Sequence, residues 1–193
     1  MGEGRSLKGA LTTSEAIWEL AAATSRMLAE EGTLRMKVEF VNPFVIAARE
    51  VLRQEIGCEV ERGDLHLHKS AYTSHDVTAI IAVTGAIQGL VLYSLKSDSA
   101  RKFVETILGQ TFVEFDELAQ SGIAELANVI TGKASILLSE AGFSSQISPP
   151  ALIIGNGTLI STLDLNRIVV PLRTELGDIE VHLALREVAR PPE

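Results

Sequence analysis

The sequence contains a single cysteine, Cys58, so no disulfide can form within the chain. A chain without disulfides is typical of a reducing compartment, and we expect a cytoplasmic protein. Aromatic residues are also scarce, at 5% of the chain, although 46% of all residues are hydrophobic. The core is therefore expected to consist mainly of valine, isoleucine, leucine and alanine.

Basic residues are too few to balance the acidic ones. The chain has 17 lysines and arginines against 25 aspartates and glutamates, which gives a formal net charge of -8. Such a chain is repelled by nucleic-acid phosphates and by anionic lipid, so we expect neither as a partner. The longest strongly apolar stretch, about 77–95, is interrupted by polar residues and glycines, which argues against a membrane span. No basic head followed by an apolar run marks a secretion signal.

Residues 1–35 differ in character from the rest and are predicted to form an arm. Thr12 and Glu15 have the spacing of a helix capping box, and apolar residues then recur at helical spacing. One amphipathic helix is expected over about 13–31. This arm is either an inert extension or linker, with Met36 as an alternative start, or a helix that docks on a partner or on the body.

Residues 36–188 are predicted to form one α/β (α+β) domain, followed by a short tail over 189–193. Helices are expected at about 43–56, 97–109 and 116–140, with Asn42-Pro43 opening the first and Ser97 or Asp98 capping the second. Strands are expected at about 60–72, 76–84, 87–95, 145–154, 158–165, 167–175 and 178–187. Turn residues at 155–157 and 176–178 predict two hairpins.

This element order suggests an internal repeat. Val77–Leu95 and Arg167–Leu185 are both β-rich segments of the same length, and each half of the domain begins with a helix that ends at a glycine. Sequence identity between the halves is too weak to prove duplication. A pseudo-twofold domain is nevertheless the expected architecture.

The helix predicted over 116–140 has an unusual outer face. At about 100° per residue, one side gathers apolar residues and is expected to be core: Ile123, Ala127, Ile130, Ala134, Leu137 and Ala141. The opposite side gathers small or polar residues: Ser121, Glu125, Asn128, Gly132 and Ser139, with Ser135 at the edge. Serine and glycine cost helix stability, but they leave a low surface that another molecule can approach.

Glu125 and Asn128 are the large polar side chains of this surface, and their spacing points them to the same side. The carboxylate is an acceptor, whereas the amide both donates and accepts hydrogen bonds. The pair itself contains no nucleophile and no base of neutral pKa, and no histidine lies near it in the sequence, so the pair suits an enzyme that completes the active site of another protein. An amide can hold a water in line with a phosphoryl group. The alternative is an ordinary solvated helix face.

The histidines on one predicted strand and the single cysteine are the other candidate sites. His66 and His68 share one face of a predicted strand and could begin a metal site, but a third ligand is missing, so an exposed polar strand face is the alternative. Cys58 lacks the cationic surroundings that activate a thiol and is expected to be a small buried residue.

Beyond these residue-level features, the chain resembles the CheX branch of the CheC/CheX/FliY chemotaxis phosphatases. The resemblance rests on Ser121-x-x-x-Glu125-x-x-Asn128 followed by a distant Pro150, on the string around it from Gly122 to Ala134, and on the segment from Met36 to Phe44. It covers about 37–187.

The resemblance implies a CheC-like pseudo-twofold fold in which two long central helices pack on an antiparallel sheet. It also implies an activity: hydrolysis of the phospho-aspartate of a CheY-type response regulator. Glu125 would contact a lysine of the regulator and Asn128 would orient the attacking water. Ser121, Gly132, Ser135 and Ser139 would form the docking surface, and Pro150 would shape the return strand.

The resemblance implies no cofactor of the chain's own, because the Mg²⁺ ion would belong to the regulator, and it implies a homodimer. A single site per chain is expected, because Phe40 and Pro43 stand where a shift of 85 residues would place Glu125 and Asn128 in the first half. The alternative is a non-catalytic binding module of the same fold, like CheC or FliM, in a chemotaxis or flagellar-switch complex.

Overall fold

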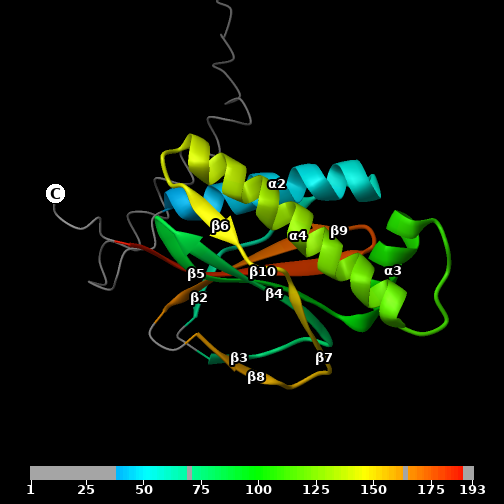
Figure 1. Ribbon diagram of the computed structural model, residues 1–193. Helices are drawn as coiled ribbons and strands as arrows, with labels where there is room; N and C mark the ends of the chain where they lie inside the picture. The colour runs from blue at the N-terminus through cyan, green and yellow to red at the C-terminus, as the bar shows by residue number, and fades with distance from the viewer. Residues whose placement is uncertain (1–37, 69–70, 163–164, 189–193) are drawn as a thin grey trace, which may run out of the picture.

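The computed structural model describes residues 38–68, 71–162 and 165–188, so the helix predicted over 13–31 lies outside the described residues (Figure 1). The helices in these ranges are α2 (Val38–Ile56), α3 (Ser97–Leu108) and α4 (Glu117–Glu140). The strands of the first half are β1 (Glu61–Arg62), β2 (His66–His68), β3 (Ala71–Thr73), β4 (Val77–Gly85) and β5 (Ile87–Leu95). Those of the second half are β6 (Ser145–Ile147), β7 (Ala151–Ile154), β8 (Leu159–Ser161), β9 (Arg167–Thr174) and β10 (Gly177–Glu187).

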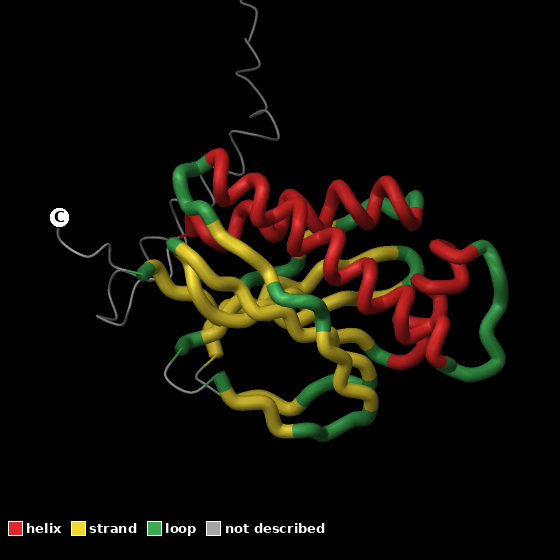
Figure 2. The backbone as a smooth tube through the Cα atoms, in the orientation of Figure 1, coloured by secondary structure: helices red, strands yellow, loops and turns green. Residues whose placement is uncertain are grey.

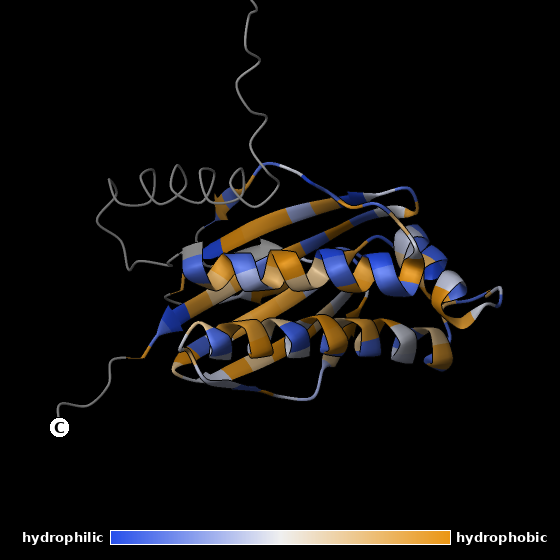
Figure 3. Cartoon of the chain, turned by 90° about the horizontal axis from the view of Figure 1, so that it is seen from above, coloured by the Kyte–Doolittle hydropathy of each residue, from blue (hydrophilic) through white to orange (hydrophobic). Residues whose placement is uncertain are grey.

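An antiparallel sheet forms the middle layer. Its strands follow the order β1-β9-β10-β5-β4-β6, with β2 also pairing with β9 and β7 with β4. Helices α2 and α4 lie side by side over one face of this sheet (Figures 1 and 3). The two-stranded β3–β8 ribbon lies on the side of the sheet away from the helices (Figure 2). None of the helices in the described part of the chain is both long and apolar enough to cross a bilayer.

The strand order confirms the predicted pseudo-twofold fold. The β4–β5 hairpin of the first half and the β9–β10 hairpin of the second meet at the β5–β10 pair in the centre of the sheet. Leu92 of β5 lies opposite His182 of β10. The second hairpin follows the first at an offset of 90 residues, and Leu92 and His182 are also 182 - 92 = 90 residues apart. The pseudo-twofold axis therefore passes between Leu92 and His182. Helix α2 is followed by the short strand β1 and helix α4 by the short strand β6, and each of these strands pairs with the hairpin of the other half.

Helix α2 starts earlier than predicted. It begins at Val38, so Pro43 lies inside the helix rather than in its first turn. Proline removes one helical hydrogen bond, here the one that would reach the Glu39 carbonyl. The extra turn is stabilised because it buries Phe40 completely, with its ring 5.0 Å from that of Phe143 in an edge-on contact. Gly57, with φ of 72°, ends the helix as predicted.

Two strand predictions are corrected by long-range pairing. The strand predicted over 60–72 is divided among β1, β2 and β3, and the first two pair with β9 while β3 pairs with β8. The hairpin predicted at 155–157 does not form, because β7 pairs with β4 and β8 with β3. Gly155 N instead donates to the Asp76 carbonyl at 2.8 Å, which ties this turn to the start of β4. The hairpin at Gly177 is confirmed and joins β9 to β10.

The N-cap residue of helix α3 lies one residue before Ser97, the first of the two predicted caps. Ser97 is already helical and Lys96 is the N-cap residue, with no side-chain cap. The Ser97 N–H donates instead to Asp76 Oδ2 at 2.8 Å, and Asn156 Nδ2 donates to Asp76 Oδ1 at 3.0 Å. These hydrogen bonds hold the pKa of Asp76 below its ordinary value, the Ser97 N–H contributing most. One carboxylate therefore joins β4, α3 and the 155–157 turn.

Candidate active site on helix α4

The helix that carries Glu125 and Asn128 is fixed at both ends. Asp116 is the N-cap, and its Oδ1 accepts a hydrogen bond from Ala119 N at 2.9 Å, which satisfies a free amide of the first turn. At the other end Gly142 takes φ of 92° and stops the helix, as predicted. The predicted core side is largely confirmed, because Ile123, Ala127, Ile130 and Ala134 are buried. Leu137 is only partly buried, and Ala141 is exposed because it lies beyond the last turn.

Neighbouring elements hold α4 on two sides. Gly122 faces α3 so closely that a Cβ atom there would lie 2.9 Å from Val104 Cγ1. Lys133 forms an ion pair with Glu50 of α2. These contacts with α3 and α2 fix the position of α4, and they leave its outer face uncovered.

Glu125 and Asn128 lie on this outer face, where Glu125 is exposed and Asn128 is partly exposed. Neither side chain makes a hydrogen bond or an ion pair to any residue that the structure describes. Because they are three residues apart, they point to the same side of the helix, about 60° apart around its axis. Both side chains are thus free to bind a group that comes from outside.

The residues predicted to form a docking surface divide into two pairs. Ser121 and Ser139 are exposed. Ser135 Oγ donates to the Ser145 carbonyl at 3.1 Å, and Gly132 faces Ile147, whose Cδ1 would lie 3.9 Å from a Cβ atom at the glycine. Ser135 and Gly132 therefore face the neighbouring strand β6. The small residues at these two positions let β6 pass close to the Asn128 side of the helix.

The other side of Glu125 carries exposed apolar residues that are not among the predicted site residues. Leu118, Val129 and Ile136 have 52%, 39% and 62% of their surfaces exposed. They lie seven residues before Glu125 and four and eleven residues after it, which places each within about 40° of Glu125 around the helix. The same helical wheel that identified the Ser/Gly face would have found them.

Pro150 lies in the loop between β6 and β7. Two residues before it, Ser148 makes two hydrogen bonds to Ala82 of β4. Its backbone N–H donates to the Ala82 carbonyl at 2.9 Å, and its Oγ accepts from Ala82 N at 3.0 Å. Pro150 directly precedes Ala151, the first residue of β7. Its position fits the predicted role in shaping the return strand.

The first half of the domain presents no equivalent pair. Phe40 and Pro43, the counterparts of Glu125 and Asn128, are both buried. Helix α2 instead exposes charged residues near its end, including Glu50, Arg53 and Glu55.

A second polar cluster lies on the sheet away from α4. Glu180 Oε2 lies 3.1 Å from His182 Nε2 and 3.3 Å from His75 Nε2. The hydrogen bond with His182 holds the pKa of Glu180 below its ordinary value, and burial lowers the pKa of His182. Within the described ranges no three histidine, cysteine, aspartate or glutamate side chains are arranged to hold a metal ion. His66 and His68 are exposed on β2, which agrees with the alternative prediction of an exposed polar strand face.

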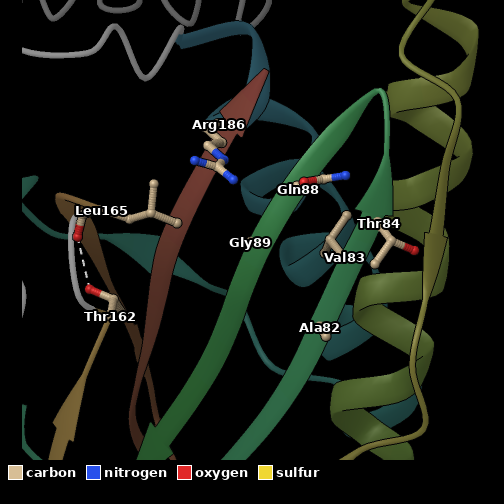
Figure 4. Close-up of a pocket in the computed structure, with 8 residues that line it drawn as sticks. All are labelled: Ala82, Val83, Thr84, Gln88, Gly89, Thr162, Leu165 and Arg186. Atoms are coloured by element: carbon tan, nitrogen blue, oxygen red, sulfur yellow. Dashed lines mark hydrogen bonds between the residues drawn. The ribbon is translucent and has the colours of Figure 1, made fainter. Parts of the chain in front are cut away.

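A pocket of about 460 Å³ also lies away from α4. It opens on the β4, β5 and β10 strands on the side opposite α2, and Thr162 and Leu165 border it (Figure 4). Its polar lining includes Arg186, Gln88 and Thr84, but no carboxylate and no histidine. These residues offer no acid–base pair. Cys58 is buried, and burial raises the pKa of its thiol, so it is no candidate nucleophile.

Comparison with known proteins decides the family. A family model described as chemotaxis phosphatase CheX matches residues 77–173. The chain belongs to the CheX family. The match includes Glu125, Asn128 and Pro150, together with the central β4–β5 hairpin.

Individual CheX relatives cover most of the chain. The CheY-P phosphatase CheX of Thermotoga maritima is 28% identical over 153 residues, which are 78% of this chain and 98% of that protein. A CheC-like superfamily protein from Shewanella has a TM-score of 0.72 at 25% identity, over 78% of this chain and 99% of its own. The CheX chain in a CheX–CheY–BeF3–Mg²⁺ complex from Borrelia burgdorferi has a TM-score of 0.64 at 25% identity, over 77% and 98%.

Proposed function

We propose that this protein hydrolyses the phospho-aspartate of a CheY-type response regulator, with Glu125 and Asn128 entering the active site of the regulator. The observation that carries the proposal is the position of both side chains on the outer face of α4, with no partner among the described residues. Membership of the CheX family and similarity to a CheY-P phosphatase support it. So does the existence of a related CheX in a complex with CheY.

In the proposed mechanism the regulator supplies most of the chemistry. It brings the phospho-aspartate, a Mg²⁺ ion and a lysine. The Asn128 amide accepts a hydrogen bond from a water and holds it in line with the phosphorus atom. The water oxygen bonds to phosphorus as the bond from phosphorus to the aspartate oxygen breaks. The products are inorganic phosphate and a free aspartate carboxylate.

Glu125 would act in binding and orientation. Its carboxylate would pair with the lysine of the regulator and thereby fix the position of α4 relative to the phosphoryl group. The absence of an internal partner for Glu125 keeps this group available without first breaking an ion pair. BeF3 with Mg²⁺ on an aspartate stands in for a phosphoryl group, so the Borrelia complex is of the type that the proposal requires.

The test is the release of inorganic phosphate from a phosphorylated receiver domain in the presence of Mg²⁺. Asn128→Ala is expected to lower kcat by about 10²-fold or more, because the attacking water loses its orientation. Glu125→Ala should also lose most activity. Both side chains face away from the core, so circular dichroism and the urea midpoint should stay close to those of the wild type. Glu55→Ala, which removes an exposed carboxylate at the end of α2, is the matched control and should keep full activity.

The same experiment separates catalysis from simple binding. If the wild-type protein binds phosphorylated regulators but accelerates phosphate release from none, the chain is a non-catalytic module of the CheC/FliM kind. We also propose, from the family resemblance, a cytoplasmic homodimer. Sedimentation equilibrium at micromolar concentration tests this, and a monomer mass would contradict it.

A further inference from the structure

Exposed aliphatic side chains are concentrated around α4. In the described part of the chain nine large apolar residues are exposed, and five of them lie between the end of α3 and the last turns of α4. These five are Leu108, Val113, Leu118, Val129 and Ile136. Single exposed apolar residues are ordinary, but a concentration in one region, with three of the five on α4, indicates an interaction surface.

Three of them share the face of Glu125. Leu118 and Ile136 are 18 positions apart on α4, or about 27 Å along its axis, and Glu125 lies between Leu118 and Val129. We refer to these three residues as the apolar stripe. A partner that accepts the Glu125 carboxylate has to cover the helix for at least a turn on each side. It therefore contacts at least Val129, the member of the apolar stripe that lies one turn from Glu125.

The charges near the stripe cannot provide much attraction for a phosphorylated partner. The charged residues of α4 are Glu117, Glu125, Lys133 and Glu140, and the single cation is already paired with Glu50. The whole chain carries a formal net charge of -8. The ion pair proposed between Glu125 and the lysine of the regulator contributes at most about 1 kcal/mol at an exposed site, so binding needs a further contribution. Burial of aliphatic side chains supplies one.

We propose that the apolar stripe is the main binding surface for the receiver domain of the phosphorylated regulator. It provides most of the affinity, whereas Glu125 fixes the docking position and Asn128 orients the attacking water. This inference rests on the proposed function. The occupant would be a receiver surface that carries aliphatic side chains beside its phosphorylation site. Val129 is central to the contact because it lies one turn from Glu125, on the side of the helix away from Asn128 and β6.

The decisive variants make the stripe polar, with a side chain of the same shape at position 129 and a shorter one at position 136. Val129→Thr and Ile136→Thr retain a β-branched side chain, so helix propensity changes little. The double variant is expected to raise KM about fivefold or more with kcat within about twofold of the wild type, as expected for an apolar anchor at an interface. Leu159→Thr is the matched control, because Leu159 is 71% exposed but lies on β8, on the other side of the sheet. It should leave KM unchanged.

The possible outcomes are distinguishable. No phosphate release by the wild type would reject the proposed function itself. An active wild type with an unchanged KM in the double variant would reject the apolar stripe as the binding surface. A fall in kcat at constant KM would also reject it, because the stripe would then act in catalysis. If the double variant instead converted a wild-type dimer to a monomer in sedimentation, the stripe would be a contact between copies of this chain.

Discussion

The hydroxyl of Tyr93 lies 2.8 Å from Thr131 Oγ1, in the closed interior between β5 and α4. Thr131 donates its own proton to the Ala127 carbonyl at 2.8 Å, so the Tyr93 hydroxyl is the donor in the pair. Burial raises the pKa of Tyr93, which keeps the phenol protonated and able to donate at neutral pH. This bond ties α4 to the central sheet less than one turn from Asn128, on the buried side of the helix.

Removing the Tyr93 hydroxyl should weaken this attachment. Tyr93→Phe is expected to lower the free energy of unfolding by about 1 kcal/mol, because one buried hydrogen bond is lost while Thr131 keeps its bond to Ala127. Thr131→Val should cost more, since it leaves a buried phenol without an acceptor. Urea denaturation of both single variants and the double variant completes a double-mutant cycle. A double variant whose cost equals the sum of the two single costs would show that the bond contributes nothing.

Replacing either of the two glycines of α4 by alanine is expected to change stability in opposite directions. At Gly122 a Cβ would lie 2.9 Å from Val104 Cγ1, and the branched valine side chain has little freedom to move. Gly122→Ala is therefore expected to destabilise the protein by about 1–3 kcal/mol, despite a gain of about 1 kcal/mol in helix propensity. At Gly132 the nearest atom is 3.9 Å from the added Cβ, which is ordinary contact.

Gly132→Ala is thus the matched control. It should stabilise the protein by up to about 1 kcal/mol, because the helix gains propensity without a clash. Thermal or urea unfolding measures both variants. A stabilised Gly122→Ala protein would contradict the close packing of α3 against α4. The phosphatase assay on Gly132→Ala adds a test of the predicted docking role of that position, since a methyl group there would alter KM if the regulator packs directly on it.

The accurate predictions from sequence were those that depend on local patterns. The β4–β5 hairpin, the end of α3 at Gly109 and both ends of α4 follow from alternating or helical spacing and from glycines that take positive φ. The start of α2 could not be predicted in this way. The turn before Pro43 exists because Phe40 packs against Phe143, which is about 100 residues away. Likewise β7 and β8 pair with distant strands rather than with each other.

In the candidate site, too, local spacing predicts some features and long-range packing decides the others. Helical spacing alone places Glu125 and Asn128 together on the outer face of α4. It does not reveal which neighbour covers the rest of that face. The pairing of β6 with β4 brings Ser145 and Ile147 against Ser135 and Gly132, whereas no described element covers Val129. The roles of Glu125 and Asn128, and any role of residues 1–35, stay predictions.

The buried histidine near the pseudo-twofold axis predicts how stability depends on pH. His182 is 2% exposed, and burial holds its pKa below the ordinary value of about 6.5. The groups around it are Glu180 on its own strand, Arg167 on β9 and His75 before β4. Between the folded and unfolded pKa values of His182, the unfolded chain binds more protons than the folded one. Stability therefore rises with pH in this window and falls as the pH drops below about 6.5.

Glu180 adds a second loss at lower pH. Its folded pKa is below its ordinary value, so its contribution is present above that ordinary value and disappears as the pH falls through the folded pKa. Because this window lies near the ordinary pKa of a glutamate, about 4.3, measurements at about pH 7.5 and 5.5 isolate the histidine.

His182→Gln tests the assignment. The glutamine amide can still donate to Glu180 but cannot take up a proton, so the loss of unfolding free energy between about pH 7.5 and 5.5 should be smaller than in the wild type. His66→Gln, which removes an exposed imidazole on β2, is the control and should keep the wild-type dependence. Urea midpoints at the two pH values measure the difference. If His182→Gln lost as much stability on acidification as the wild type, another group would be responsible, and the interior around His182 would have to admit water.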